Sequence, residues 1–166
     1  MVNKKSSGAN KIAQGNAAQL LVASELNRRG WSAAVTLGNA PHVDVLCSNE
    51  CGTKFVFVQV KSFHLKSKSC AVGAKAEITY SDNFFWVIVG LSDGPDTQDV
   101  FYIIPALDMA KNVKELYERW LSALGRNGRP HNETSMRKVC IGGRCGEYDI
   151  SQWKNRWDLI DDALKD

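Results

Sequence analysis

The spacing of apolar residues predicts a helix near the start of the chain, followed by strands. Apolar side chains recur every three or four residues between Gly15 and Leu26, and this spacing predicts a helix that ends before Gly30. Residues 31–37 predict a short strand, and 38–41 predict a loop rich in small residues. The first part of the chain is therefore expected to lay one amphipathic helix against a sheet.

The strongest strand signals lie in the middle of the chain. Two β-prone runs, 43–47 and 54–61, flank a polar connection that contains glycine, which predicts a β-hairpin. Residues 84–91 are apolar almost throughout and predict a strand buried on both faces. Residues 100–104 predict a further strand. These segments are expected to form one sheet.

The last third of the chain predicts two helices and one more strand. Proline suits the first turn of a helix, so Pro105 is expected to begin one that runs to about Leu124. A polar, glycine-rich loop at 125–135 leads to a strand at 136–141. Ser151 is expected to cap a final helix whose two tryptophans form a core-packing face.

The order of these elements predicts an α/β fold with a central mixed sheet flanked by helices. The length of 166 residues argues for a single domain. We expect residues 1–10 to form a disordered tail and residues 11–166 to form that domain. Because 44% of residues are hydrophobic and 23% are charged, the composition is that of a globular protein. Intrinsic disorder, collagen and coiled coil are excluded.

Three features of the sequence favour a cytoplasmic protein. The apolar run 84–91 is far shorter than the roughly 20 residues that a membrane-spanning helix needs, so no membrane partner is expected. Residues 1–8 lack the apolar segment of a secretory signal. Five cysteines are an odd number, which suits reduced thiols better than a disulfide framework.

The net charge of +3 conceals separate basic and acidic blocks. Residues 51–76 hold five lysines and no acid, and a basic, serine-rich loop is expected at 62–76. Residues 119–146 hold six Lys and Arg residues against Glu133 alone, whereas 77–118 hold eight acids and two lysines. Segregated basic blocks can form a surface that faces phosphate groups, although solvated loops beside acidic helices would show the same pattern.

One cluster of polar residues interrupts the predicted hairpin. Asp44 lies within an apolar run, where a carboxylate is costly unless a metal or a cation pairs with it. Gln59 and Lys61 lie two residues apart on one strand and therefore point to the same face. If 43–47 pairs with 54–61, a carboxylate, an amide and an ammonium meet at one end of the sheet.

This arrangement resembles the PD-(D/E)xK nuclease superfamily. The pattern of that family is a helix that carries an acid, an Asp on one strand of a hairpin, and acid-x-Lys on the next strand. The corresponding residues here are Glu25, Asp44, Gln59 and Lys61. The resemblance covers roughly residues 14–104, with Gln in place of the second acid, as in some members, and with two residues between Pro41 and Asp44.

The resemblance implies a restriction-endonuclease-like fold of three layers and a metal-dependent DNA endonuclease that uses Mg²⁺ or Mn²⁺. In this interpretation Asp44 is the principal metal ligand, and the Gln59 side-chain oxygen and the Val60 carbonyl complete the protein ligands. Glu25 would hold a second metal or a metal-bound water. Lys61 would orient the attacking water and stabilise developing charge.

DNA is the partner that this interpretation implies, with a homodimer expected if both strands are cut. The candidate DNA-contacting residues belong to the two basic blocks. They are Ser62, Lys66, Lys68, Lys75, Arg137 and Lys138. The DNA feature that would be recognised stays open at this point.

Two other functions also fit the sequence. Gln59 removes one negative charge from the expected metal site, so a nucleic-acid-binding relative without cleavage activity is one alternative. For Asp44 and Lys61 themselves, a cross-strand ion pair with a structural role is a further interpretation. The other is an interaction domain stapled by zinc, in which cysteine pairs near turns provide the ligands. Those cysteines are Cys47, Cys51, Cys140 and Cys145.

Overall fold

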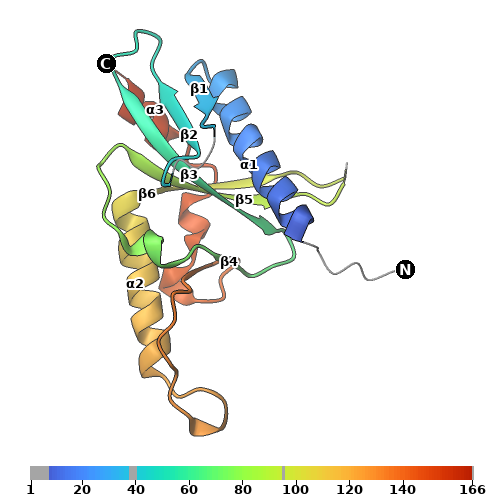
Figure 1. The fold of residues 1–166 in the computed structure, drawn as a ribbon, viewed down its shortest axis with the longest axis vertical. Helices are drawn as coiled ribbons and strands as arrows, with labels where there is room; N and C mark the ends of the chain where they lie inside the picture. Colours follow the sequence, from blue (N-terminus) through green and yellow to red (C-terminus); the bar gives the residue numbers. More distant parts are fainter. Residues whose placement is uncertain (1–7, 38–40, 95, 166) are drawn as a thin grey trace.

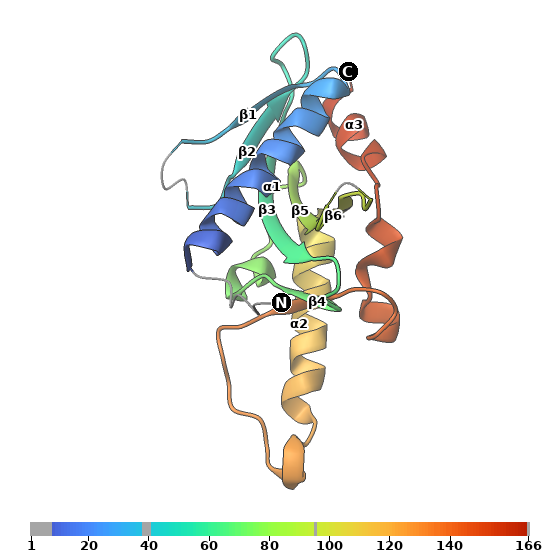
Figure 2. The same cartoon turned by 90° about the vertical axis from the view of Figure 1, so that its right-hand side faces the viewer.

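A mixed five-stranded sheet organises the structure, and helices cover both of its faces (Figures 1 and 2). The computed structural model describes residues 8–37, 41–94 and 96–165. The α-helices are α1 (Gly8–Arg28), α2 (Ala106–Ser122) and α3 (Asp158–Leu164). The strands are β1 (Ser32–Val35), β2 (Val45–Ser48), β3 (Phe55–His64), β4 (Ser69–Ala71), β5 (Phe84–Leu91), β6 (Val100–Pro105) and β7 (Lys138–Cys140). Short 3₁₀ helices span Ala74–Glu77, Arg126–Gly128, Gly146–Tyr148 and Ile150–Trp153.

The strand order in the main sheet is β1-β2-β3-β5-β6. Strands β1, β2 and β3 pair antiparallel in sequence order, as the predicted hairpin requires. Strand β5 then pairs parallel with β3, and β6 returns antiparallel to β5. Strands β4 and β7 form a separate two-stranded sheet. The predicted α/β fold with a mixed sheet between helical layers is confirmed.

Alternation along β5 builds a hydrophobic core on each side of the sheet. Phe85 and Val87 face a cluster that includes buried residues of α1 and α3. Phe84, Trp86 and Ile88 face a second cluster that includes buried residues of α2. Because both faces of β5 are covered, its near-continuous apolar sequence is what a central strand requires.

The structure departs from the sequence-based prediction at the start of the chain. Helix α1 begins at Gly8, so residues 8–10 are helical and do not belong to the predicted tail. Residues 1–7 and 38–40, which include most of the loop predicted at 38–41, lie outside the described residues. The predicted end of the helix is confirmed, since Gly30 has a φ of 92° and leaves the right-handed helical region.

The basic segment 62–76 contains more regular structure than a loop. Strand β3 continues to His64, β4 follows, and a short 3₁₀ helix spans Ala74–Glu77. At the end of β3, Phe63 packs against the backbone of Gly90, where a Cβ would come within 2.7 Å of its ring. This close approach explains a glycine inside the central strand.

The C-terminal helix is shorter than predicted, and Ser151 does not cap it. Asp149 instead caps the 3₁₀ helix Ile150–Trp153 by accepting a hydrogen bond from the Ser151 amide. Helix α3 begins only at Asp158. Trp153 and Trp157 therefore pack against different sides of the sheet instead of forming one helical face. Among the described residues, no helix is both long and apolar enough to cross a bilayer.

Truncation of a core residue tests the packing around the sheet. Ile103 on β6 is fully buried, and Ile103→Ala should lower the free energy of unfolding by about 2–5 kcal/mol because it leaves a cavity. Leu107 on α2 is 62% exposed, so Leu107→Ala should change it by less than about 0.5 kcal/mol. Urea denaturation measures both values, and equal losses would contradict this packing.

Candidate functional site

The pairing of β2 with β3 brings Asp44 next to Gln59. Val45 lies opposite Val58 in the antiparallel register, so the next pair outward is Asp44 and Gln59. The Asp44 amide donates a hydrogen bond of 2.8 Å to the Val58 carbonyl, which continues the ladder by one residue. The predicted hairpin and the predicted meeting of Asp44 with Gln59 are confirmed.

Three donors hold the Asp44 carboxylate. Its Oδ2 atom accepts hydrogen bonds from the Val60 amide at 2.7 Å and from the Gln59 side chain. Its Oδ1 atom accepts a hydrogen bond of 2.9 Å from the side-chain nitrogen of Gln19 on α1. The carboxylate is thereby fixed between the helix and the sheet.

Burial raises the pKa of Asp44 above its ordinary value. The Val60 amide, the Lys61 ammonium and the Gln59 side chain act in the opposite direction, in that order, without cancelling the effect of burial. The ionised carboxylate is therefore destabilised in the folded protein. A cation at this position would relieve that cost.

Lys61 is the positively charged residue whose charge acts on this carboxylate. It follows Gln59 on the same face of β3, and its charge acts on both Asp44 and the buried thiol of Cys70. In the described part of the chain no carboxylate forms an ion pair with Lys61 within 4.0 Å. The residue is half-buried, and its ammonium is not tied to an acid among the described residues.

The structure does not bring Glu25 to this site. Glu25 forms ion pairs with Arg29 at 3.1 Å and with Arg28 at 3.5 Å, in the last turns of α1. Gln19 lies six residues earlier, about 9 Å along the helix axis. Because α1 crosses the sheet with its middle turns beside Asp44, the helix contributes an amide where the sequence predicted an acid.

Neighbouring contacts fix the segment that precedes Asp44. Tyr80 forms a hydrogen bond of 2.9 Å with His42, and Lys75 donates one of 3.3 Å to the carbonyl of Pro41. The hydroxyl of Thr36 donates to the Val43 carbonyl. These contacts hold the segment against the end of β1 and the region before β5. The backbone that leads into Asp44 is therefore held in place.

The predicted DNA-contacting residues differ in solvent exposure and in the contacts that they already make. Lys68 and Lys138 are exposed, and Lys75 is exposed although it contacts a carbonyl. Lys66 forms an ion pair of 3.3 Å with Asp93. The carbonyl of Ser62 accepts a weak hydrogen bond from the Cys70 thiol at 3.6 Å.

Arg137 does not present its guanidinium to solvent. It pairs with Glu77, donates a hydrogen bond of 2.7 Å to the Thr134 carbonyl, and lies 3.3 Å from the ring centre of Tyr117. Only 10% of its side chain is exposed. The structure therefore assigns Arg137 to packing of the loop before β7, which corrects its expected contact with DNA.

The cysteines do not form a zinc site. Cys140 and Cys145 are joined by a disulfide, whereas Cys47 is buried and Cys51 is exposed. No three His, Cys, Asp or Glu side chains in residues 8–37, 41–94 and 96–165 lie close enough together to bind a metal. The zinc-stapled alternative and the expectation of reduced thiols throughout are both wrong. Burial raises the pKa of the Cys47 thiol to about 11, which also makes it a poor nucleophile.

Comparison with known proteins identifies the fold. No protein-family model and no curated protein sequence matches the chain. Among solved structures, the bacterial homing endonuclease I-Ssp6803I matches with a TM-score of 0.51 at 17% identity, over 95% of this chain and 94% of that chain. The chain has the restriction-endonuclease-like fold. Hjc, a Holliday junction resolvase from Archaeoglobus fulgidus, covers 76% of this chain and 83% of its own, with a TM-score of 0.44 at 13% identity.

The donor set around Asp44 fits a hard divalent cation in chemical type. It consists of a carboxylate and two side-chain amides, and each amide can present its oxygen by a half-turn about its last bond. Mg²⁺ prefers oxygen ligands and retains several waters, so it needs few groups from a protein. Asp44 and Lys61 carry opposite charges, which leaves the four side chains of the site formally neutral.

The raised pKa of Asp44 predicts a pH-dependent stability difference. Because the folded pKa exceeds the unfolded one, ionisation of Asp44 costs stability increasingly as pH rises from the unfolded pKa through the folded pKa. In metal-free buffer, the difference in melting temperature between Asp44→Asn and the wild type should therefore shift in favour of Asp44→Asn as pH rises through this acidic range. At higher pH the difference should stay constant. Thermal unfolding between pH 3 and pH 8 measures this difference, and an advantage that shrinks with rising pH would contradict the placement of this carboxylate.

Proposed function

We propose that this protein is a metal-dependent endonuclease that hydrolyses phosphodiester bonds in DNA. The observation that carries the proposal is the meeting of Asp44, Gln59 and Lys61 at one end of the β2–β3 hairpin. The fold, shared with a homing endonuclease, supports the same activity.

Asp44 is the principal metal ligand in this proposal. The side-chain oxygens of Gln59 and Gln19 contribute further ligands, and the adjacent Val60 carbonyl is the remaining candidate. A bound Mg²⁺ or Mn²⁺ would supply charge neutralisation at the scissile phosphate and lower the pKa of a coordinated water. Gln19 takes the place that the sequence pattern gave to Glu25, so the helix contributes no negative charge.

Lys61 acts on the phosphate and on the attacking water. Its ammonium lies on the same face of β3 as Gln59, and no carboxylate of the described residues forms an ion pair with it. It can therefore donate hydrogen bonds to a non-bridging phosphate oxygen and stabilise the charge that develops there. It can also orient a water molecule against phosphorus.

A site with one carboxylate should bind a free cation weakly. Each additional negative ligand strengthens the binding of a hard cation, and here the protein supplies only Asp44, partly offset by Lys61. A DNA phosphate brings the missing negative charge. We therefore expect the affinity for Mn²⁺ to rise when DNA is bound.

A nucleic-acid-binding protein without cleavage activity is the second candidate function. Both carboxylate oxygens of Asp44 already accept hydrogen bonds from protein donors. The site is thus self-satisfied without a cation, as a purely structural network would be. A cleavage assay with Mg²⁺ and Mn²⁺ separates the two candidates.

Substitution at Asp44 and Lys61 tests the proposed chemistry. Asp44→Ala should abolish cleavage but preserve or strengthen DNA binding, because loss of a carboxylate reduces repulsion of phosphate. Lys61→Ala should slow the chemical step by about 10²–10³-fold through loss of one preorganised charge. Nicking of supercoiled plasmid and gel-shift assays measure the two effects separately.

The two helix residues provide a matched control for this experiment. Gln19→Ala removes a contact to Asp44 and should reduce cleavage, whereas Glu25→Ala removes only ion pairs with arginines and should leave cleavage unchanged. Cleavage that survives Asp44→Ala would refute the assignment. If the folded wild type bound DNA without cutting it in either metal, the second candidate would stand.

The exposed lysines of the two basic blocks predict salt-sensitive binding. Each neutralised phosphate adds about −0.9 to the slope of log K against log salt for duplex DNA. Combined alanine substitution of Lys68, Lys75 and Lys138 should flatten that slope by up to about three units. Lys165→Ala removes a lysine that is paired with Asp162 and serves as the control. An unchanged slope in the triple variant would place the DNA contacts elsewhere.

A further inference from the structure

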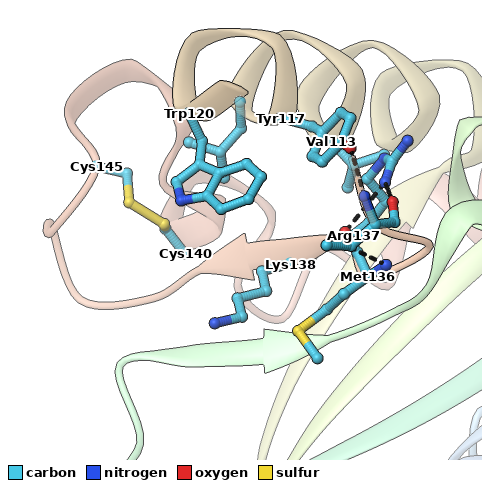
Figure 3. Close-up of a pocket in the computed structure, with 10 residues that line it drawn as sticks. Val113, Tyr117, Trp120, Met136, Arg137, Lys138, Cys140 and Cys145 are labelled. Carbon is cyan, nitrogen blue, oxygen red and sulfur yellow. Dashed lines mark hydrogen bonds between the residues drawn. A yellow bond between two sulfur atoms is a disulfide. The ribbon is translucent and has the colours of Figure 1, made fainter. Parts of the chain in front are cut away.

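A cavity of about 380 Å³ lies between α2 and the segment that contains β7 (Figure 3). Tyr117 and Trp120 form its wall on the helix, and Met136 and Lys138 lie opposite them. The disulfide bond of Cys145 closes one end. The volume falls in the range of sites that bind small organic groups.

The cavity combines exposed apolar faces with positive charge. Trp120 is 39% exposed and Met136 is 54% exposed, although both are large hydrophobic residues. Arg137 and Lys138 are the charged side chains among the described residues that line it. Arg137 is paired with Glu77, so the exposed Lys138 is the one of these two whose charge can meet an anion. In the surrounding block 119–146, Glu133 is the single acid. An occupant with a flat apolar ring and an attached anion suits both properties.

Aromatic contacts fix the helical wall before any ligand binds. His131 stacks on Trp120 with ring centres 4.0 Å apart, and the ring centre of Tyr117 lies 5.6 Å from that of Trp120. The Tyr117 hydroxyl accepts a hydrogen bond of 2.9 Å from the Thr134 amide. The loop after α2 is thereby held against the helix, so ring positions are set in advance.

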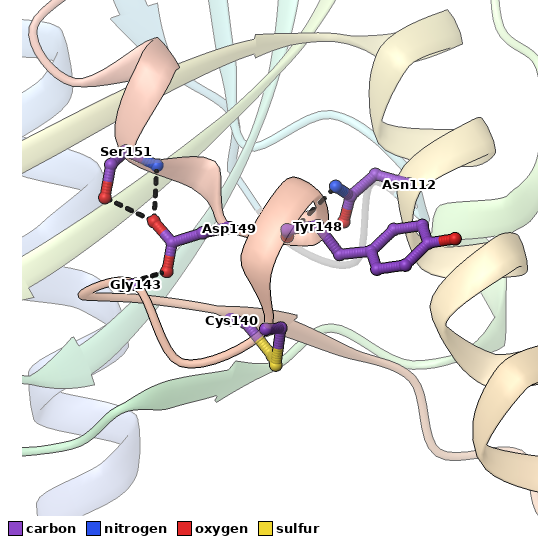
Figure 4. The surroundings of a disulfide bond; sticks show 7 residues. Asn112, Cys140, Gly143, Tyr148, Asp149 and Ser151 are labelled. Carbon is purple, nitrogen blue, oxygen red and sulfur yellow. Dashed lines mark hydrogen bonds between the residues drawn. A yellow bond between two sulfur atoms is a disulfide. The ribbon is translucent and has the colours of Figure 1, made fainter. Parts of the chain in front are cut away.

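The opposite wall is held by a network around the disulfide (Figure 4). Asp149 accepts hydrogen bonds from the Gly143 amide at 2.6 Å and from the Ser151 amide at 2.9 Å. Asn112 of α2 donates one of 3.1 Å to the Tyr148 carbonyl. Both walls are therefore preformed, which lowers the entropic cost of binding.

The cavity is linked to the Asp44 site by the small sheet. In that sheet β7 pairs with β4, with Val139 opposite Cys70. The Cys70 thiol in turn contacts the carbonyl of Ser62, the residue after Lys61. A nucleic acid bound at the Asp44 site that continued across β4 and β7 would therefore reach the cavity.

We propose that this cavity binds one unpaired nucleobase of the nucleic acid, with Trp120 as the stacking surface and Lys138 as a contact to the adjoining phosphate. The proposal rests on the proposed function, because it assumes a nucleic-acid substrate. Base stacking on an aromatic side chain tolerates any base, so the cavity selects unpaired structure and not sequence. A fully paired duplex cannot place a base there without breaking a pair.

The test compares a perfect duplex with the same duplex that carries one unpaired nucleotide, by fluorescence anisotropy in EDTA. The wild type should bind the second probe about tenfold more tightly. Trp120→Ala should remove this preference and leave the affinity for the perfect duplex unchanged, and Trp120→Phe should keep most of it. Equal affinities of the wild type for the two probes would overturn the proposal.

A second pair of variants avoids any change to the aromatic packing. Met136→Glu places a negative charge at the cavity and should remove the preference, whereas Met136→Gln should retain most of it. Leu124→Glu adds the same charge at a residue that is 70% exposed and does not line the cavity, and it should have no effect. Loss of the preference in Leu124→Glu to the same extent would overturn the proposal.

Two further outcomes separate this inference from the proposed function. Asp44-dependent cleavage by a wild type that shows no preference for the unpaired nucleotide would overturn the inference alone. Absence of any nucleic-acid binding would overturn both.

A change in sedimentation mass caused by Trp120→Ala would show that the cavity binds a second copy of the chain. That result would overturn the proposal that the cavity binds a nucleobase.

Discussion

The antiparallel register between β2 and β3 is the constraint on which the candidate site depends. With Val45 opposite Val58, Asp44 meets Gln59, and the next amide along β3 reaches the carboxylate. A slip of one residue would turn the buried face of β2 to solvent, so burial of Val45 and Cys47 against α1 and α3 fixes the register. The hydrophobic core thus positions a polar site whose carboxylate the protein would otherwise not bury.

Charge balance explains how such a site could act on a phosphodiester. Burial makes the ionised Asp44 costly, and the side chains around it are neutral except for Lys61. The protein therefore holds a carboxylate that a cation would stabilise and an ammonium that an anion would stabilise. In the proposed function, a metal ion and a phosphate would satisfy both at once, which would couple the two binding events.

Local patterns predicted much of this structure. The alternation of 54–61 and the apolar run of 84–91 were sufficient for the hairpin and the central strand, and hence for the meeting of Asp44 with Gln59. The contribution of α1 could not be predicted, because the crossing angle of the helix decides which turn lies beside Asp44. An amide such as Gln19 also carries no acidic signature in the sequence. The packing of Arg137 depends likewise on a long-range contact between α2 and the loop before β7.

Calorimetric titration of Mn²⁺ into the protein tests the central claim most directly, because it measures the cation at the Asp44 site without reference to any DNA sequence. With a short duplex present, the wild type should bind Mn²⁺ more tightly than without it, Asp44→Asn should lose this site, and Glu25→Ala should retain it. Gln59→Glu should bind Mn²⁺ more tightly than the wild type by virtue of its second carboxylate. Equal binding of Mn²⁺ by the wild type and Asp44→Asn, with both variants folded, would contradict a metal-dependent site at Asp44.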